Sequence, residues 1–91
     1  MKKYEHMLTE YTLTFNEVLD EMFNSCDTLW FQGEDFQEGI IIYLGNGRVQ
    51  MVYFDKDKSS SPFATPIHLT SSLYHMKYRR VYTQKDAMRE L

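Results

Sequence analysis

The sequence contains few of the residues that build disulfide frameworks, membrane spans or export signals. Its single cysteine, Cys26, has no second thiol to pair with, and this suits a reducing compartment such as the cytoplasm. No apolar run approaches the roughly 20 residues of a membrane-spanning helix. The start, Met1-Lys2-Lys3-Tyr4, continues with polar residues rather than with the apolar core of a signal peptide. We therefore expect a cytoplasmic protein that is neither exported nor inserted into a membrane.

Positive charge is also scarce in this chain. Ten Lys and Arg residues face thirteen Asp and Glu residues, which gives a net charge of −3. A protein that follows the backbone of DNA or RNA needs a positive surface. Polymeric nucleic acid is therefore not an expected partner. A small β-barrel that binds single strands would use the aromatic residues, but it would lack its positive groove.

The length of the chain limits it to one domain. A chain of 91 residues buries only about two-thirds of its unfolded surface, so it builds a single small core. We predict one α+β domain over residues 1–91, with a small antiparallel sheet, one N-terminal helix and a short second helical turn. Residues 1–12 form an N-terminal arm, either packed on a neighbouring subunit or frayed. Residues 83–91 form a C-terminal tail, either helical or frayed.

The strongest local pattern is a β-hairpin over residues 39–54. Two runs rich in β-branched and aromatic residues flank Gly45-Asn46-Gly47, which tolerates positive φ. Both faces of the hairpin are apolar, and an antiparallel sheet with two apolar faces needs cover on each. One cover can come from this chain, and we expect the other from a second copy. Successive residues of the first run alternate between the faces, with Ile40, Ile42 and Leu44 on one and Ile41 and Tyr43 on the other.

A helix is predicted to begin at Thr14. Thr14 and Glu17 have the spacing of a capping box, and Leu13 and Val18 that of a hydrophobic staple. Asn24-Ser25 supplies a stop. The apolar stripe expected to cover one face of the sheet consists of Phe15, Val18, Leu19, Met22 and Phe23.

The remaining elements are shorter. We predict a strand at residues 28–31, a turn at 32–35 and a surface loop at 55–62. Later come an extended piece at residues 67–69, a brief helical turn at 70–75 with N-cap hydroxyls, and a last strand at 78–82.

Few residues have the spacing of a metal or catalytic site. His6, His68 and His75, with one cysteine, reproduce no zinc signature. Glu34, Asp35 and Glu38 could act as paired catalytic carboxylates, but charged residues also fill such turns simply because the turns are solvated. We expect no metal, no cofactor and no catalysis. The Lys77, Arg79 and Arg80 cluster is either a solvated strand edge or a phosphate site.

Several aromatic residues lie beside small hydrogen-bonding residues. A nucleotide suits such a set, because its base stacks on a ring while its edge and phosphates take hydroxyl and amide donors. Phe15 and Trp30 also fit a core, and Phe36 lies in an otherwise polar loop. The candidate ligand-binding residues are Phe15, Asn16, Trp30, Phe36, Gln37, Thr70, Ser71 and Ser72.

The order of these features resembles the second type of Thoeris anti-defence protein, a family of small phage proteins. In the family, an early Thr-Phe-x-x-x-Leu-x-x-Leu helix precedes a strand, a Trp-Asn-Gly loop, an apolar strand and a late Asp-Leu-x-x-x-Asp-Trp-x-x-Val segment. The resemblance covers residues 13–82. Phe36-Gln37 stands in place of the loop Trp-Asn, and Ser72 and Lys77 replace the two late aspartates. Here the matching residues are Thr14, Phe15, Leu19 and Met22 in the helix, 40–44 in the strand, and Leu73, Tyr78 and Val81 in the late segment.

The resemblance implies a sponge that holds its ligand without turnover. The expected ligand is a cyclic ADP-ribose isomer, such as the glyco-cyclic form, made by bacterial immune TIR enzymes. The expected assembly is a homo-oligomer, with a tetramer as its state, in the cytoplasm of the host cell. Tyr78, in the late segment, joins the candidate ligand-binding residues.

A second function class stays open beside the sponge. A phage inhibitor could bind a host protein directly through an acidic surface, without any small ligand. That surface would be supplied by Glu34, Asp35, Glu38, Asp55 and Asp57.

Overall fold

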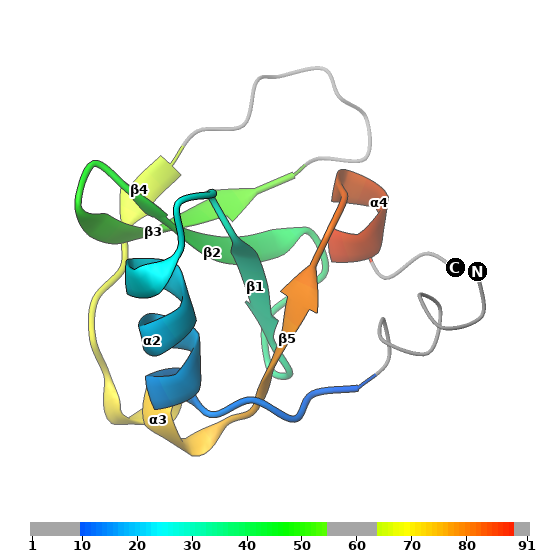
Figure 1. Cartoon of the computed structure of the whole chain (residues 1–91). Helices are drawn as coiled ribbons and strands as arrows, with labels where there is room; N and C mark the ends of the chain where they lie inside the picture. Colours follow the sequence, from blue (N-terminus) through cyan, green and yellow to red (C-terminus); the bar gives the residue numbers. More distant parts are fainter. Residues whose placement is uncertain (1–9, 55–63, 89–91) are drawn as a thin grey trace.

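The chain folds into one sheet with short helices on both faces (Figure 1). The structure, a computed structural model, describes residues 10–54 and 64–88. Its five strands are antiparallel and lie in the order β4-β3-β2-β1-β5, which confirms a small α+β fold. The elements are α2 (Phe15–Asn24), β1 (Trp30–Gly33), β2 (Ile40–Gly45), β3 (Arg48–Tyr53), β4 (Ala64–Pro66), α3 (Ser71–His75), β5 (Tyr78–Val81) and α4 (Gln84–Ala87).

The predicted hairpin is present as β2 and β3. Asn46 and Gly47 take φ values of 54° and 76°, the left-handed pair that a two-residue turn between twisted strands requires. Pairing runs from Gly45 opposite Arg48 at the turn to Ile40 opposite Tyr53 at the far end. The turn chemistry thus fixes the register of the predicted hairpin.

Helix α2 begins with the predicted capping box. The Thr14 hydroxyl accepts from the Glu17 N–H at 3.2 Å, and the Glu17 carboxylate accepts from the Thr14 N–H at 2.8 Å. Met22, like the other buried members of the stripe, faces the sheet. The prediction for Phe23 was wrong, because its side chain is 57 % exposed. Position 23 lies about 100° around the helix from Met22, beyond the face that the sheet covers.

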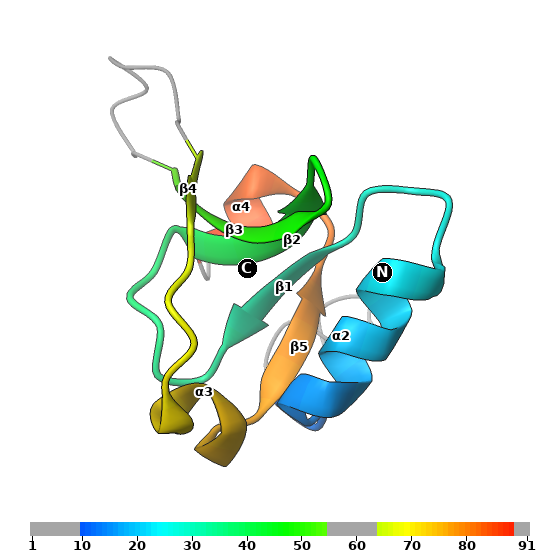
Figure 2. The same cartoon turned by 90° about the vertical axis from the view of Figure 1, so that its left-hand side faces the viewer.

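Both faces of the sheet are covered within this chain. On one face, α2 and α3 pack over Phe31, Ile42 and Tyr78. On the other, Ala87 of α4 and the following Met88 join a second cluster. Figure 2 shows α2 and α4 on opposite sides of the strands. The expected need for a second copy on this face is therefore met by the C-terminal segment, which is more than a polar tail. The core of the second cluster is Ile41, Val52, Phe54, Val81, Ala87 and Met88.

Two strand boundaries differ from the prediction. Strand β1 continues through Gln32 and Gly33, which were assigned to a turn, because they pair with Arg79 and Tyr78 of β5. An extended piece was predicted at residues 67–69, but the strand that pairs with β3 is β4, which ends before residue 67. Beyond β4, the Ile67 N–H still donates to a carbonyl of β3. The loop predicted at residues 55–62 lies outside the described residues. The short helix α3 and the last strand β5 are present where they were predicted.

The described part of the N-terminal arm is attached to β5. Leu13 forms an antiparallel bridge with Tyr78, in which the Tyr78 N–H donates to the Leu13 carbonyl at 2.7 Å. The N–H groups of Thr12 and Leu13 both donate to the Tyr78 carbonyl at 3.0 Å. This attachment holds the chain at the edge of the sheet immediately before α2. Residues 1–9 of the predicted arm lie outside the described residues.

Candidate functional site

Tyr78 connects three separate parts of the chain. Its side chain is fully buried, and its hydroxyl donates to the Leu73 carbonyl of α3 at 2.8 Å. Burial raises the pKa of Tyr78, and the nearby Asp35 carboxylate and Tyr74 hydroxyl raise it further. Tyr78 of β5 therefore lies close both to α3 and to the loop between β1 and β2.

Two of the predicted aromatic residues meet Tyr78. The Phe15 ring lies 5.5 Å from the Tyr78 ring between centroids, and the Phe36 ring lies 6.0 Å away, edge to face. Phe36 is half-buried, and its ring packs on Gly33. A Cβ added to Gly33 would lie 2.9 Å from the Cε1 atom of Phe36. The same Cβ would lie 2.5 Å from the Met76 sulfur. Phe36 is thus fixed against the backbone of β1.

The predicted polar residues lie on the surface around these rings. Thr70, Ser71 and Ser72 are exposed at the start of α3, and the Thr70 and Ser72 hydroxyl oxygens are 2.9 Å apart. Gln37 is exposed in the β1–β2 loop, and Asn16 is exposed in the first turn of α2. Figures 1 and 2 both show α3 and the β1–β2 loop at the same end of the sheet. Hydroxyl and amide groups are therefore available around this end.

Trp30 does not join this group. Its ring packs on Phe54, with 5.2 Å between centroids, in the cluster on the opposite face of the sheet. Phe15 does lie beside Tyr78, but only 1 % of its surface is exposed, so it supports the core and offers no free ring face. Near Tyr78, the predicted residues that reach the surface are one half-buried ring and three hydroxyl residues, namely Phe36, Thr70, Ser71 and Ser72.

Sequence reasoning missed two residues near this end of the sheet. Tyr74 of α3 is 49 % exposed and packs edge to face on Phe15, with 4.9 Å between centroids. Asp35 was considered as a catalytic or solvated carboxylate and as part of an acidic surface, yet it raises the pKa of the buried Tyr78. For Tyr74 a signal was present, because it follows the predicted N-cap hydroxyls within the same helical turn. For Asp35 the electrostatic interaction joins distant parts of the chain, and no local pattern contains it.

The predicted basic cluster is divided by the fold. Arg79 is 2 % exposed, and its Nη1 pairs with the Asp86 carboxylate at 3.0 Å. Its Nη2 donates to the Gln32 side-chain oxygen at 2.7 Å and to the Asp86 carbonyl at 2.9 Å. Arg79 is therefore neither on a solvated edge nor free to neutralise a phosphate. Its charge is used to hold α4 on the sheet.

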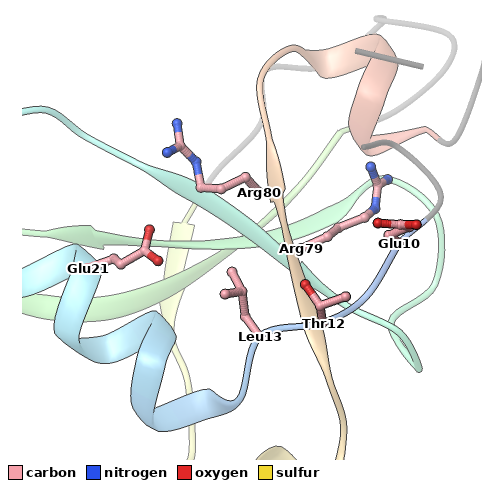
Figure 3. A pocket seen from close by; sticks show the side chains of 6 residues that line it. All are labelled: Glu10, Thr12, Leu13, Glu21, Arg79 and Arg80. Carbon is pink, nitrogen blue, oxygen red and sulfur yellow. The ribbon is translucent and has the colours of Figure 1, made fainter. Parts of the chain in front are cut away.

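A pocket of about 240 Å³ lies beside β5. The two arginines of this pocket point to opposite sides of the strand, with Glu10 on the Arg79 side and Glu21 on the Arg80 side (Figure 3). None of the predicted ligand-binding residues lines this space. The lining residues are Glu10, Thr12, Leu13, Glu21, Arg79 and Arg80.

The charges of this pocket do not favour a phosphate. The Arg80 guanidinium lies over the Tyr82 and Phe31 rings, at 4.7 Å and 5.6 Å from their centroids. Within the described ranges no carboxylate forms an ion pair with Arg80, and its buried Nε has no hydrogen-bond partner there. The carboxylates of Glu10 and Glu21 line the same pocket as this cation. A doubly charged anion would be repelled by them.

In residues 10–54 and 64–88, no group of three or more His, Cys, Asp and Glu side chains could hold a metal ion. Glu34, Asp35 and Glu38, weighed as catalytic carboxylates, are exposed in or beside the β1–β2 turn. Among the described helices, none is both long and apolar enough to cross a membrane.

Comparisons with known proteins add no relative to this picture. The chain matches no protein-family model, no curated protein and no solved structure.

Proposed function

We propose that this protein binds a cyclic ADP-ribose-type signalling nucleotide and holds it without turnover. The observation that carries the proposal is the meeting of the β1–β2 loop and α3 at Tyr78. Rings and hydroxyls that are distant in the sequence lie around this one end of the sheet. An aromatic surface beside hydroxyl and amide donors suits the base and ribose of a nucleotide. Sequestration of such a signal would inhibit bacterial Thoeris anti-phage defence, as the family resemblance implies.

We further propose that the protein acts in the cytoplasm of the host cell as a homo-oligomer, and we expect a tetramer. Support for association comes from large apolar side chains on the surface, because monomers tend to limit such exposure. Leu69 is 67 % exposed, and Phe23 and Tyr53 are more than half exposed. Leu69 adjoins Thr70, so an interface at Leu69 would lie near the proposed ligand site.

Native mass spectrometry of the protein mixed with a nucleotide extract tests the proposal directly. We expect a nucleotide adduct with a fixed stoichiometry, observed together with the mass of the assembly. An extract from cells that express a TIR enzyme should give more adduct than an extract from cells that lack it. If neither extract yields a nucleotide adduct, the proposed function is wrong.

Absence of turnover has its own test. Heating the complex should release the same cyclic nucleotide, in an amount equal to the protein. The released nucleotide should again activate the NADase that the signal switches on in Thoeris defence. Chromatography of the released material measures this. A linear or hydrolysed product that accumulates beyond the protein concentration would mean that the protein is an enzyme, and His68, His75 and Glu38 would be the first residues to replace.

The second candidate function is direct inhibition of a host protein through an acidic surface. Three exposed carboxylates of one short segment favour it, namely those of Glu34, Asp35 and Glu38. Asp55 and Asp57, which were also assigned to that surface, lie outside the described residues. The two functions make opposite predictions for inhibition of a purified effector. A sponge requires the nucleotide signal to be limiting, whereas a direct inhibitor acts at any signal concentration.

A further inference from the structure

The aromatic rings at the Tyr78 end differ in how much surface they offer to a ligand. Phe15 and Tyr78 are buried, and Phe36 is half-buried over Gly33. Tyr74, at 49 % exposed, is the most exposed aromatic residue of this group. A base stacks only on a ring face that solvent can reach. Among the described rings at this end, Tyr74 meets that condition best.

The Tyr74 ring is also held in position. The edge-to-face contact with Phe15 has an interplanar angle of 83°, and Phe15 is itself fixed against the buried Tyr78. A ring whose orientation is already set loses less conformational freedom when a ligand stacks on it. The core residue Phe15, predicted to bind ligand, therefore contributes by orienting the neighbouring ring.

The charge near this end selects between parts of a nucleotide. Asp35 is exposed and follows Glu34, whose N–H donates to the carbonyl of Lys77, the residue before Tyr78, at 2.9 Å. A carboxylate accepts hydrogen bonds from ribose hydroxyls or from an exocyclic amine, but it repels phosphate oxygens. On the same strand as Tyr78, Arg79 is already neutralised by Asp86. Base and ribose therefore fit the Asp35 side of this end better than phosphates do.

We infer that Tyr74 is the ring on which the base of the ligand stacks, and that Asp35 accepts hydrogen bonds from its ribose or amine groups. The site thus recognises the nucleoside part of the ligand, while the phosphates point away from Asp35. This inference rests on the proposed function and assigns the stacking role, predicted for Phe36, to Tyr74.

Calorimetry with three probes tests the inference on the intact protein. The probes are cyclic ADP-ribose, adenosine and inorganic pyrophosphate. We expect adenosine to compete with the cyclic nucleotide, and pyrophosphate not to compete. Tyr74→Ala should weaken binding of both nucleoside-containing probes by about 5- to 150-fold, the range that corresponds to loss of one stacking ring. Tyr74→Phe keeps the ring and should bind as the wild type does.

Two further variants separate binding from folding. Tyr82→Ala removes another exposed tyrosine, which contacts Arg80 instead, and should leave affinity unchanged. Asp35→Asn alters an exposed turn residue without changing its shape. It should weaken adenosine binding, even if Tyr74→Ala disturbs the Phe15 contact and lowers stability.

The outcomes distinguish this inference from the proposed function. If the wild type binds cyclic ADP-ribose, but Tyr74→Ala binds it equally well and Phe36→Ala does not, Phe36 is the stacking ring. The inference is then wrong and the proposed function stands. Competition by pyrophosphate without competition by adenosine would also overturn the inference alone. A wild type that binds no nucleotide, in this experiment or from the extracts, overturns both.

Discussion

Gly39 and Gly47 both adopt positive φ, at 88° and 76°, but their surroundings differ. A Cβ on Gly39 would lie 2.6 Å from the Phe54 carbonyl oxygen, whereas a Cβ on Gly47 would meet nothing within 4 Å. Gly47→Ala should therefore cost only the backbone strain, about 1–2 kcal/mol. Gly39→Ala should cost more, because Phe54 would have to move as well. Urea unfolding of the two variants measures the difference, and equal costs would show that the Phe54 carbonyl yields easily.

The buried Tyr78 hydroxyl predicts how stability depends on alkaline pH. Its raised pKa means that the native state keeps this proton above the pH, near 10, at which an unfolded tyrosine loses it. Below that pH both states are protonated and the contribution to stability is complete. Above it the unfolded state releases the proton while the native state retains it, so the free energy of unfolding falls as the pH rises.

Tyr78→Phe is the control for this pH dependence. The variant loses the hydrogen bond to the Leu73 carbonyl, worth about 1 kcal/mol, and should be less stable at neutral pH. Because it has no phenol at this position, its stability should decline less steeply than that of the wild type above about pH 10. Parallel curves for the two proteins in urea titrations would contradict a role for Tyr78 ionisation.

At the scale of elements, α4 depends on a buried ion pair. This helix has only four residues. The Arg79–Asp86 ion pair holds it to β5. Gln32 holds it to β1, because its side-chain N–H group donates to the Ala87 carbonyl at 2.9 Å. Arg79→Met would leave the Asp86 carboxylate buried without its partner. Loss of one member of such a pair typically costs about 3–5 kcal/mol.

A double replacement provides the matched comparison for Arg79→Met. Removing the carboxylate as well, in Arg79→Met with Asp86→Leu, removes the uncompensated charge, so part of the loss should be recovered. Urea unfolding gives both free energies. A double variant that is less stable than Arg79→Met would show that Asp86 acts mainly through the Tyr82 N–H, to which its second oxygen is bonded at 2.8 Å.

The elements that could be predicted from the sequence are those with local causes. The turn at Asn46-Gly47 and the capping box of Thr14 and Glu17 each depend on residues within a few positions of one another. Strand β4 and the packing of α4 depend instead on contacts with distant residues. Gln32 was assigned to a turn for the same reason, since its place in β1 follows from pairing with Arg79.

The candidate site shows the same division. The hydroxyls at the start of α3 were predicted from their sequence, and the structure keeps them exposed. No local pattern could show that Trp30 and Phe15 would lie on opposite faces of the sheet, because that depends on the register of β1. The proximity of Asp35 to Tyr78 likewise appears only after β1 and β5 have paired.

At the scale of the whole molecule, the two core clusters change the argument for association. The second face of the hairpin was expected to need another copy, but Ala87 and Met88 pack there. The surfaces that remain for an oligomer are exposed apolar side chains outside both clusters. Members of this set are Phe23, Tyr53 and Leu69.

Light scattering over a range of protein concentrations tests the proposed assembly. We expect a mass of four times the 10.9 kDa of one chain at micromolar concentration, with little binding of an apolar dye, because association would cover the exposed side chains. Leu69→Lys is a suitable variant, since Leu69 is 67 % exposed and a lysine there changes no core contact. If Leu69 lies in the interface, the variant should have a smaller mass. A wild-type monomer that still binds the nucleotide would show that one chain forms the whole site and that the tetramer is wrong.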